Sequence, residues 1–81
     1  MPDAMETVKN FILQEFLPGE SPDQLKATTP LITGGILDSI ATLKLVAFLE
    51  EQFHIKLEAH EVDVDNLNTL ADISRLIQAK R

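Results

Sequence analysis

The chain has 81 residues, 44% of them hydrophobic, which is enough for one small core but leaves little room for a deep catalytic cleft. Thirteen acidic residues against seven basic ones give a net charge of −6, which argues against nucleic acid and anionic membranes as partners. The absence of cysteine excludes disulfides, thiolate metal sites and cysteine nucleophiles. Because no apolar run has the length of a signal core or a membrane span, we expect a cytoplasmic monomer with one domain over residues 1–81.

A first helix is predicted from about Asp3 to Leu17. Asp3 and Glu6, three residues later, have the spacing of a capping box. Pro18-Gly19 ends the helix, because proline cannot continue it and glycine favours a turn. The apolar stripe at helical spacing consists of Met5, Val8, Phe11, Ile12 and Phe16.

The segment from Pro18 to Asp38 is long and irregular, with three prolines and all three glycines of the chain. A loop of this length in so small a domain is usually functional or disordered. Scattered apolar side chains favour a loop that packs over the core. These anchors are Leu25, Leu31, Ile32, Ile36 and Leu37.

A second helix is predicted from about Ser39 to Phe53, and a helical wheel divides it into two faces. An apolar face, with Leu43 and Phe48 at its flanks, is expected to point into the core. It comprises Thr42, Leu45, Val46, Leu49 and Phe53. An outer face is expected to meet solvent and partners, and it comprises Ile40, Lys44, Ala47 and Glu51.

The remaining sequence predicts a short helical turn from about Val62 to Leu67 and a last helix from about Thr69 to Lys80. Either Asn68 or Thr69 can cap the last helix, whose apolar stripe begins at Leu70. We expect no β-sheet, because residues 55–57 alternate only briefly and no strand partner is evident. The predicted fold class is all-α: a small four-helix bundle of three main helices and one short helix, with a long loop between the first two.

Asp38-Ser39 at the start of the second helix has two interpretations. The simpler one is a helix cap, since Asp is common at this position. The other is an attachment site, because the positive end of the helix dipole favours a phosphodiester on the Ser39 hydroxyl. The preceding Gly34 and Gly35 let the backbone adopt angles that other residues avoid.

The run GILDSIATLKLVAFLEEQF resembles the prosthetic-group region of acyl and peptidyl carrier proteins. The resemblance implies a non-catalytic protein with phosphopantetheine, donated by coenzyme A, attached covalently to Ser39. Asp38 then belongs to the same motif and caps the helix. The implied partners are a phosphopantetheinyl transferase, an acid- or amino-acid-activating ligase and an acyltransferase or condensation enzyme. The arm would hold an acyl or aminoacyl group as a thioester.

Departures from the fatty-acid pattern point to a subtype. Fatty-acid carriers usually have acidic residues where this chain has Ala41 and Lys44. The stretch from Gly35 to Ile40 is similar to Gly-Leu-Leu-Asp-Ser-Met of D-alanyl carriers. We therefore expect a stand-alone aminoacyl or D-alanyl carrier in natural-product, antibiotic or cell-envelope biosynthesis. A fatty-acid or polyketide carrier and a non-covalent helical adaptor remain as alternatives.

Metal binding is not expected. Two histidines, His54 and His60, would need a third ligand such as Glu58, Glu61 or Asp63, and residues near a turn at this spacing are more often plain surface groups. Asp63 and Asp65 begin like a calcium loop, but the required glycine and later glutamate are missing. No catalytic carboxylate pair is evident either.

Overall fold

The computed structural model describes residues 4–80, and of Pro22 the backbone alone. Within this range there are helices and no strand, which confirms the all-α prediction of three main helices and one short one. The radius of gyration is 11.5 Å, close to the ~12 Å expected for a folded chain of this length. In chain order the elements are α1 (Ala4–Phe16), η1 (Pro22–Gln24), α2 (Ser39–Phe53), η2 (Ala59–Glu61), α3 (Val64–Leu67) and α4 (Leu70–Lys80).

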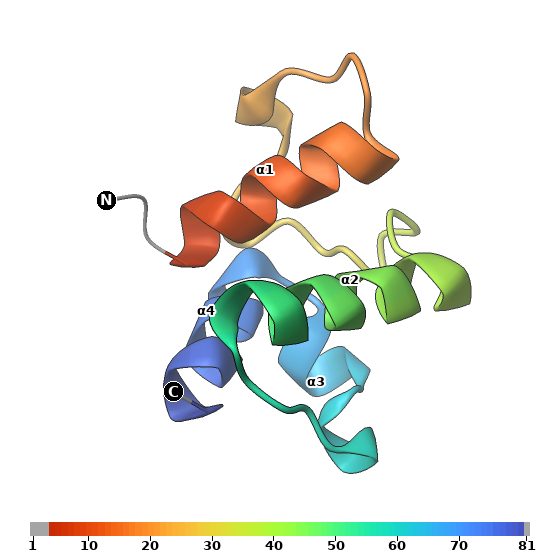
Figure 1. Cartoon of the computed structure of the whole chain (residues 1–81). Helices are drawn as coiled ribbons and strands as arrows, with labels where there is room; N and C mark the ends of the chain where they lie inside the picture. The colour runs from red at the N-terminus through yellow and green to blue at the C-terminus, as the bar shows by residue number, and fades with distance from the viewer. Residues whose placement is uncertain (1–3, 81) are drawn as a thin grey trace.

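Three of the helices meet at one core. Figure 1 shows α1 and α2 as two long helices running across the view, with α3 and α4 beneath α1. Helix α1 packs against α4 and α2, and the short α3 packs against α4. The long loop leaves α1, carries η1, and returns to the start of α2 (Figure 1).

The core draws on every main helix and on the long loop. Its fully buried side chains include Ile12 from α1, Leu49 from α2 and Ile73 from α4. Burying such a side chain stabilises the fold by roughly 1.5–3 kcal/mol. The loop is packed over the core as predicted, because Leu25, Leu31 and Leu37 are buried while Ile32 and Ile36 are half-buried.

The predicted faces of α2 need two corrections. Leu45 and Leu49 are buried as expected, and Ala41, which the helical wheel assigned to neither face, is buried as well. Leu43, expected at the flank of the core, is 65% exposed. Only one side of α2 is covered by the neighbouring helices. Val46 and Phe53 are therefore half-buried at its margins rather than central.

The helix boundaries agree with the sequence to within one or two residues. Helix α1 begins at Ala4 and ends at Phe16, and the predicted cap Asp3 lies outside the described residues. Helix α4 is capped by Thr69, whose hydroxyl oxygen accepts the Asp72 backbone N–H at 3.0 Å. Asn68, the alternative cap, contacts the long loop instead.

Candidate functional site

At the start of α2, Ser39 is exposed to solvent, while Asp38 and Thr42 make the contacts that cap the helix. The Asp38 carboxylate accepts the Ala41 backbone N–H at 2.7 Å, and the Thr42 hydroxyl donates to the Asp38 carbonyl at 2.7 Å. Asp38 is therefore the N-cap, as predicted. Ser39 is the first residue of the helix and is exposed, so its hydroxyl lies outside the core at the positive end of the helix dipole.

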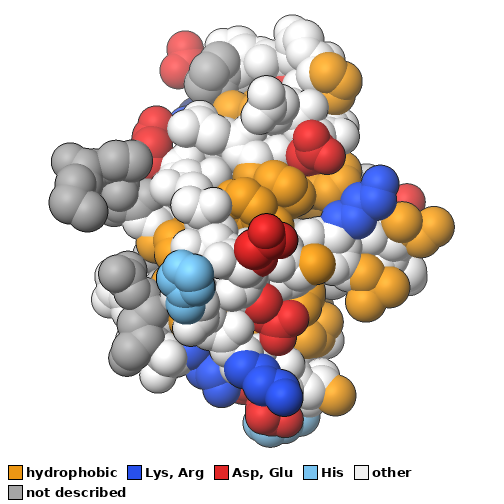
Figure 2. Space-filling model, in the orientation of Figure 1, with side chains coloured by type: hydrophobic (Ala, Val, Ile, Leu, Met, Phe, Trp, Pro, Cys, Tyr) orange, Lys and Arg blue, Asp and Glu red, His pale blue; other side chains and the backbone are white. Residues whose placement is uncertain are grey.

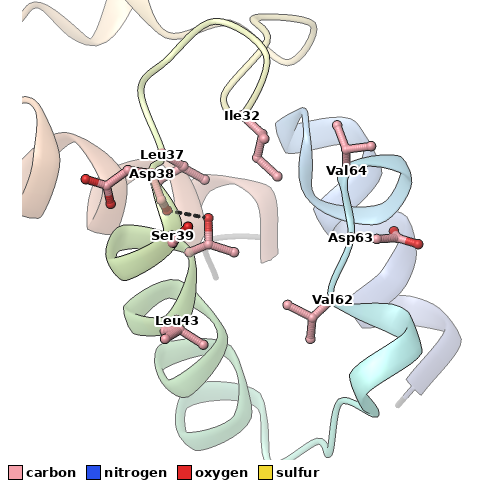
Figure 3. Close-up of a pocket in the computed structure, with 9 residues that line it drawn as sticks. Ile32, Leu37, Asp38, Ser39, Leu43, Val62, Asp63 and Val64 are labelled. Carbon is pink, nitrogen blue, oxygen red and sulfur yellow. Dashed lines mark hydrogen bonds between the residues drawn. The ribbon is translucent and has the colours of Figure 1, made fainter.

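Beside Ser39 lies an open groove of about 580 Å³ between the start of α2 and the segment leading into α3. Figure 3 shows the side chains of Ile32 and Val62 pointing into the groove, whereas the Asp63 side chain points away from it. The groove can therefore accept a slender, mostly apolar group that begins at Ser39. Its lining residues are Ile32, Leu37, Asp38, Ser39, Thr42, Leu43, Val62, Asp63 and Val64.

The α3 side of the groove is held by polar contacts around Glu61. One Glu61 carboxylate oxygen accepts the Glu58 backbone N–H and the Lys80 ammonium, both at 2.9 Å. The Glu58 N–H first, and the Lys80 ammonium second, hold the pKa of Glu61 below its usual value. The Glu61 carbonyl also accepts the Asn66 side-chain amide at 3.1 Å. These contacts fix η2 to α3 and to the end of α4, next to Val62.

The α2 side of the groove is a tightly folded turn. The Leu37 N–H donates to the Leu31 carbonyl at 2.8 Å, closing residues 31–37 into a compact loop just before Ser39. Gly35 has a φ of +83°, the left-handed conformation that glycine adopts most easily. Gly34 is required for a different reason than predicted. A Cβ there would overlap the Pro30 carbonyl oxygen.

Gly34→Ala is expected to destabilise the chain and to displace this turn. Because the overlapping atom belongs to the backbone, relief requires the loop itself to move, at a cost of about 1–3 kcal/mol. Urea unfolding followed by circular dichroism measures the change. Thr28→Ala, at an exposed position in the same loop, is the control and should stay within about 0.5 kcal/mol of the parent. Equal stability of the two variants would contradict the close approach of Gly34 to Pro30.

The predicted outer face of α2 is exposed along its length. Ile40 has 67% of its surface accessible, and Lys44, Ala47 and Glu51 are exposed as well. Figure 2 shows hydrophobic side chains gathered over the junction of α1 and α2. Phe11 of α1 stacks on Phe48 of α2 there, with ring centroids 4.0 Å apart. The exposure matches the wheel, and the use of this face by partners stays a prediction.

The two histidines have no shared site. His54 follows α2 in a left-handed conformation with φ of 55°, and its N–H donates to the Glu50 carbonyl, so its observed role is to end the helix. His60 is exposed in η2. Residues 4–80 contain no group of three side chains placed to hold a metal ion. None of the helices in this range has the length and apolar character needed to cross a bilayer.

The sequence predicted Asp38 and Ser39 at the start of α2 and an exposed outer face, as the structure shows, but it did not predict the groove. Leu43, Val62 and Val64 were not recognised as lining residues, because they come from two segments about twenty residues apart. Val62 lies just before α3, and exposed Val64 begins it. No local signal marked Leu43, because the helical wheel assigned it to the edge of the core, whereas the structure leaves it 65% exposed.

This combination of a helical fold and an exposed Ser at a helix start corresponds to a known class of protein. A family model described as "Phosphopantetheine attachment site" matches residues 12–77. The chain therefore belongs to the phosphopantetheine-binding carrier proteins, the family of the acyl carrier proteins. Members of this family bear a phosphopantetheine arm and are not themselves enzymes. Membership implies a phosphopantetheinyl transferase and biosynthetic enzymes as partners.

Individual relatives agree with the family. The chain is 35% identical over 69 residues to "Probable acyl carrier protein PigG" of Serratia sp. (strain ATCC 39006), covering 85% of this chain and 78% of the relative. It is 32% identical over 73 residues to "Acyl carrier protein" of Bdellovibrio bacteriovorus, covering 90% and 88%. A chain in the solved "Crystal structure of FAD-dependent dehydrogenase" superposes with a TM-score of 0.78 at 33% identity, covering 86% of this chain and 97% of that one.

Proposed function

We propose that Ser39 is the residue that carries the phosphopantetheine arm. The supporting observation is its position: Ser39 is an exposed hydroxyl at the first residue of α2, directly beside the apolar groove. Asp38 and Thr42 make the cap contacts at this end of α2, so the Ser39 hydroxyl is available for modification. The positive end of the helix dipole favours the phosphodiester charge that modification introduces.

The modification is a phosphoryl transfer from coenzyme A. The Ser39 oxygen forms a bond to the phosphorus that bears pantetheine, the pyrophosphate bond of coenzyme A breaks, and adenosine 3′,5′-bisphosphate leaves while the hydroxyl proton passes to solvent or the transferase. The arm supplies a thiol, which a chain without cysteine otherwise lacks. Acyl groups are then carried on this thiol as thioesters, and the fold itself stays outside the partner's active site.

The cargo we propose is an aminoacyl group, in natural-product or cell-envelope biosynthesis, delivered by an amino-acid-activating ligase. The support is the outer face of α2, where Lys44 is exposed at a position that fatty-acid carriers usually make acidic. An acyl cargo is the alternative, and it is favoured by the similarity to two proteins named as acyl carriers. Loading assays with purified ligases for amino acids, D-alanine and fatty acids discriminate the two.

The proposal for Ser39 is tested by incubating the purified chain with coenzyme A and a broad-specificity phosphopantetheinyl transferase. Intact-mass spectrometry should show one added arm, and peptide fragmentation should assign it to Ser39. A second site, Ser21 or Ser74, would contradict the assignment. A chain that gains no mass would instead support the non-covalent adaptor, in which Ile40 and Ala47 form a docking face and Ser39 is structural only.

Lys44→Glu is expected to redirect partner choice. A partner surface built for an acidic α2 meets Lys44 as a like charge, and such a mispaired charge costs about 1 kcal/mol, or roughly a fivefold change in rate. The variant should therefore become a better substrate for fatty-acid synthase enzymes and a poorer one for its own ligase. Loading rates measured with both enzyme sets over a range of salt concentrations give the comparison, with the largest difference at low salt.

The control for this experiment is Lys56→Glu, which makes the same change of charge at an exposed residue after the end of α2. It should leave both loading rates near those of the parent. If Lys44→Glu behaves like Lys56→Glu at every salt concentration, the outer face of α2 does not select the partner. A second acidic substitution at Ala41 is unsuitable, because Ala41 is buried and a carboxylate there would be desolvated.

A further inference from the structure

Asn68 lies between α3 and α4, and its groups bond three successive residues of the long loop. Its side-chain oxygen accepts the backbone N–H groups of Ile32 and Thr33, both at 3.0 Å. Its backbone carbonyl accepts the Leu31 N–H at 2.6 Å. Its side-chain amide nitrogen lies 3.3 Å from the Thr33 hydroxyl. One residue therefore satisfies the backbone donors of three consecutive loop positions, 35 to 37 residues earlier in the chain.

These bonds connect the two sides of the groove. Residues 31–33 begin the turn that closes at Leu37 and leads directly into Asp38 and Ser39. Ile32, whose N–H is one of the two held by the side chain, points into the groove in Figure 3. Asn68 itself is the C-cap of α3, so it is rigidly connected to the opposite side, which Val64 helps to line. The Asn68 side chain thus adds two bonds, to Ile32 and Thr33, to the backbone bond and the buried Leu31 and Leu37 that hold this loop beside α3.

We infer that Asn68 is a positioning residue: it fixes the loop 31–37 so that Ser39 and the groove are presented in the arrangement that the modifying enzyme binds. This inference rests on the proposed role of Ser39 and adds a residue outside the motif. Without the side-chain bonds, the loop would sample other conformations. Only a fraction of the molecules would then have the arrangement that the modifying enzyme binds. Because a partner that binds the competent form has its apparent affinity reduced by that fraction, the effect should fall on KM and leave kcat unchanged.

The test uses Asn68→Ala and Asn68→Asp in the full chain, with coenzyme A and a phosphopantetheinyl transferase. Asn68→Ala should raise the KM for the carrier roughly tenfold, the loss expected from one or two hydrogen bonds, with kcat unchanged. Asn68→Asp keeps the oxygen that accepts the Ile32 and Thr33 N–H groups, and it should restore the KM. Asn68→Gln serves as a second, milder variant, because its amide is displaced by one methylene, and a raised KM is expected there too.

Thr69→Ala is the matched control. It removes one hydrogen bond at the next residue, the cap of α4, and leaves in place the Asn68 side chain that bonds Ile32 and Thr33. Its melting temperature should fall, but its KM should stay at the parent value. This separates loop positioning from a general loss of stability, since a merely structural role would affect both variants alike.

Amide hydrogen exchange provides a readout that does not depend on modification. The Ile32 and Thr33 amides should exchange slowly in the parent and in Asn68→Asp, and faster in Asn68→Ala and Asn68→Gln. A parental KM in Asn68→Ala, or an Asn68→Asp variant as defective as Asn68→Ala, would overturn the inference while leaving Ser39 as the site. A parent chain that gains no arm at all would overturn the proposed function, and exchange at Ile32 and Thr33 would still decide whether Asn68 holds the loop.

Discussion

Leu49→Ala is expected to lower the free energy of unfolding by about 2–5 kcal/mol. Leu49 is fully buried in α2, and truncation would remove apolar contacts and leave a cavity where α1, α2 and α4 enclose the core. A domain of this length has a total stability of only about 4–12 kcal/mol. The variant should therefore be close to unfolded at physiological temperature. Urea or thermal unfolding followed by circular dichroism measures the loss.

Ile40→Ala is the matched control, because it truncates a large aliphatic side chain of the same helix on its outer face. Ile40 is 67% exposed, so the change should remain within about 0.5 kcal/mol of the parent. Phe53→Ala should lie between the two, since Phe53 is only half-buried. A larger loss of stability in Ile40→Ala than in Leu49→Ala would reverse the assignment of the two faces.

The sequence predicted the main helices well because their apolar residues recur at helical spacing and their ends carry clear signals. Helix α2 occupies Ser39–Phe53 as predicted, with Asp38 as its cap, and Thr69 caps α4. The burial of the loop anchors also followed from sequence, because apolar side chains in a segment rich in proline and glycine have no other favourable place than the core. These signals are local, so a single chain is enough to show them.

The groove could not be predicted, because its two sides come from distant parts of the chain. Leu43 follows the apolar periodicity of α2, yet it is exposed because no helix covers that side. Asn68 appeared to be a helix cap, since Asn is common at that position, but its side chain bonds a loop 35 residues earlier. Gly34 looked like a source of backbone freedom, but its requirement is space beside Pro30. Each of these properties depends on tertiary contacts that no local pattern encodes.

The two faces of α2 differ in burial. Leu45 and Leu49 hold the helix in the core, while Ile40 and Lys44 on the opposite face are exposed. Ser39 lies at the N-terminal end of α2, beside both faces. Substitutions on the outer face are therefore expected to have little effect on stability, so the proposed role of this face in recognition can be tested without unfolding the chain.

Ser39→Ala is expected to abolish modification completely while leaving the fold intact. Ala removes only the hydroxyl oxygen from an exposed residue, and it is the best helix former, so stability should stay within about 0.5 kcal/mol of the parent. The cap of α2 is retained, because the Asp38 carboxylate and the Thr42 hydroxyl make its contacts. Without the hydroxyl there is no oxygen to form the phosphodiester, so intact mass should show no added arm after incubation with coenzyme A and transferase.

Ser74→Ala, a half-buried position within α4 and outside the motif, is the matched control and should gain the arm at the parental rate. Ser21→Ala, in the long loop before η1, should do the same. Circular dichroism of all three variants must match the parent for the comparison to concern chemistry rather than folding. If folded Ser39→Ala still gained the arm, the attachment site would be another residue. The groove beside Ser39 would then not be the place that accepts the arm. If the arm is lost in Ser39→Ala alone, the hydroxyl at the start of α2 is the acceptor, since the cap, the helix and the other residues that line the groove are unchanged in that variant.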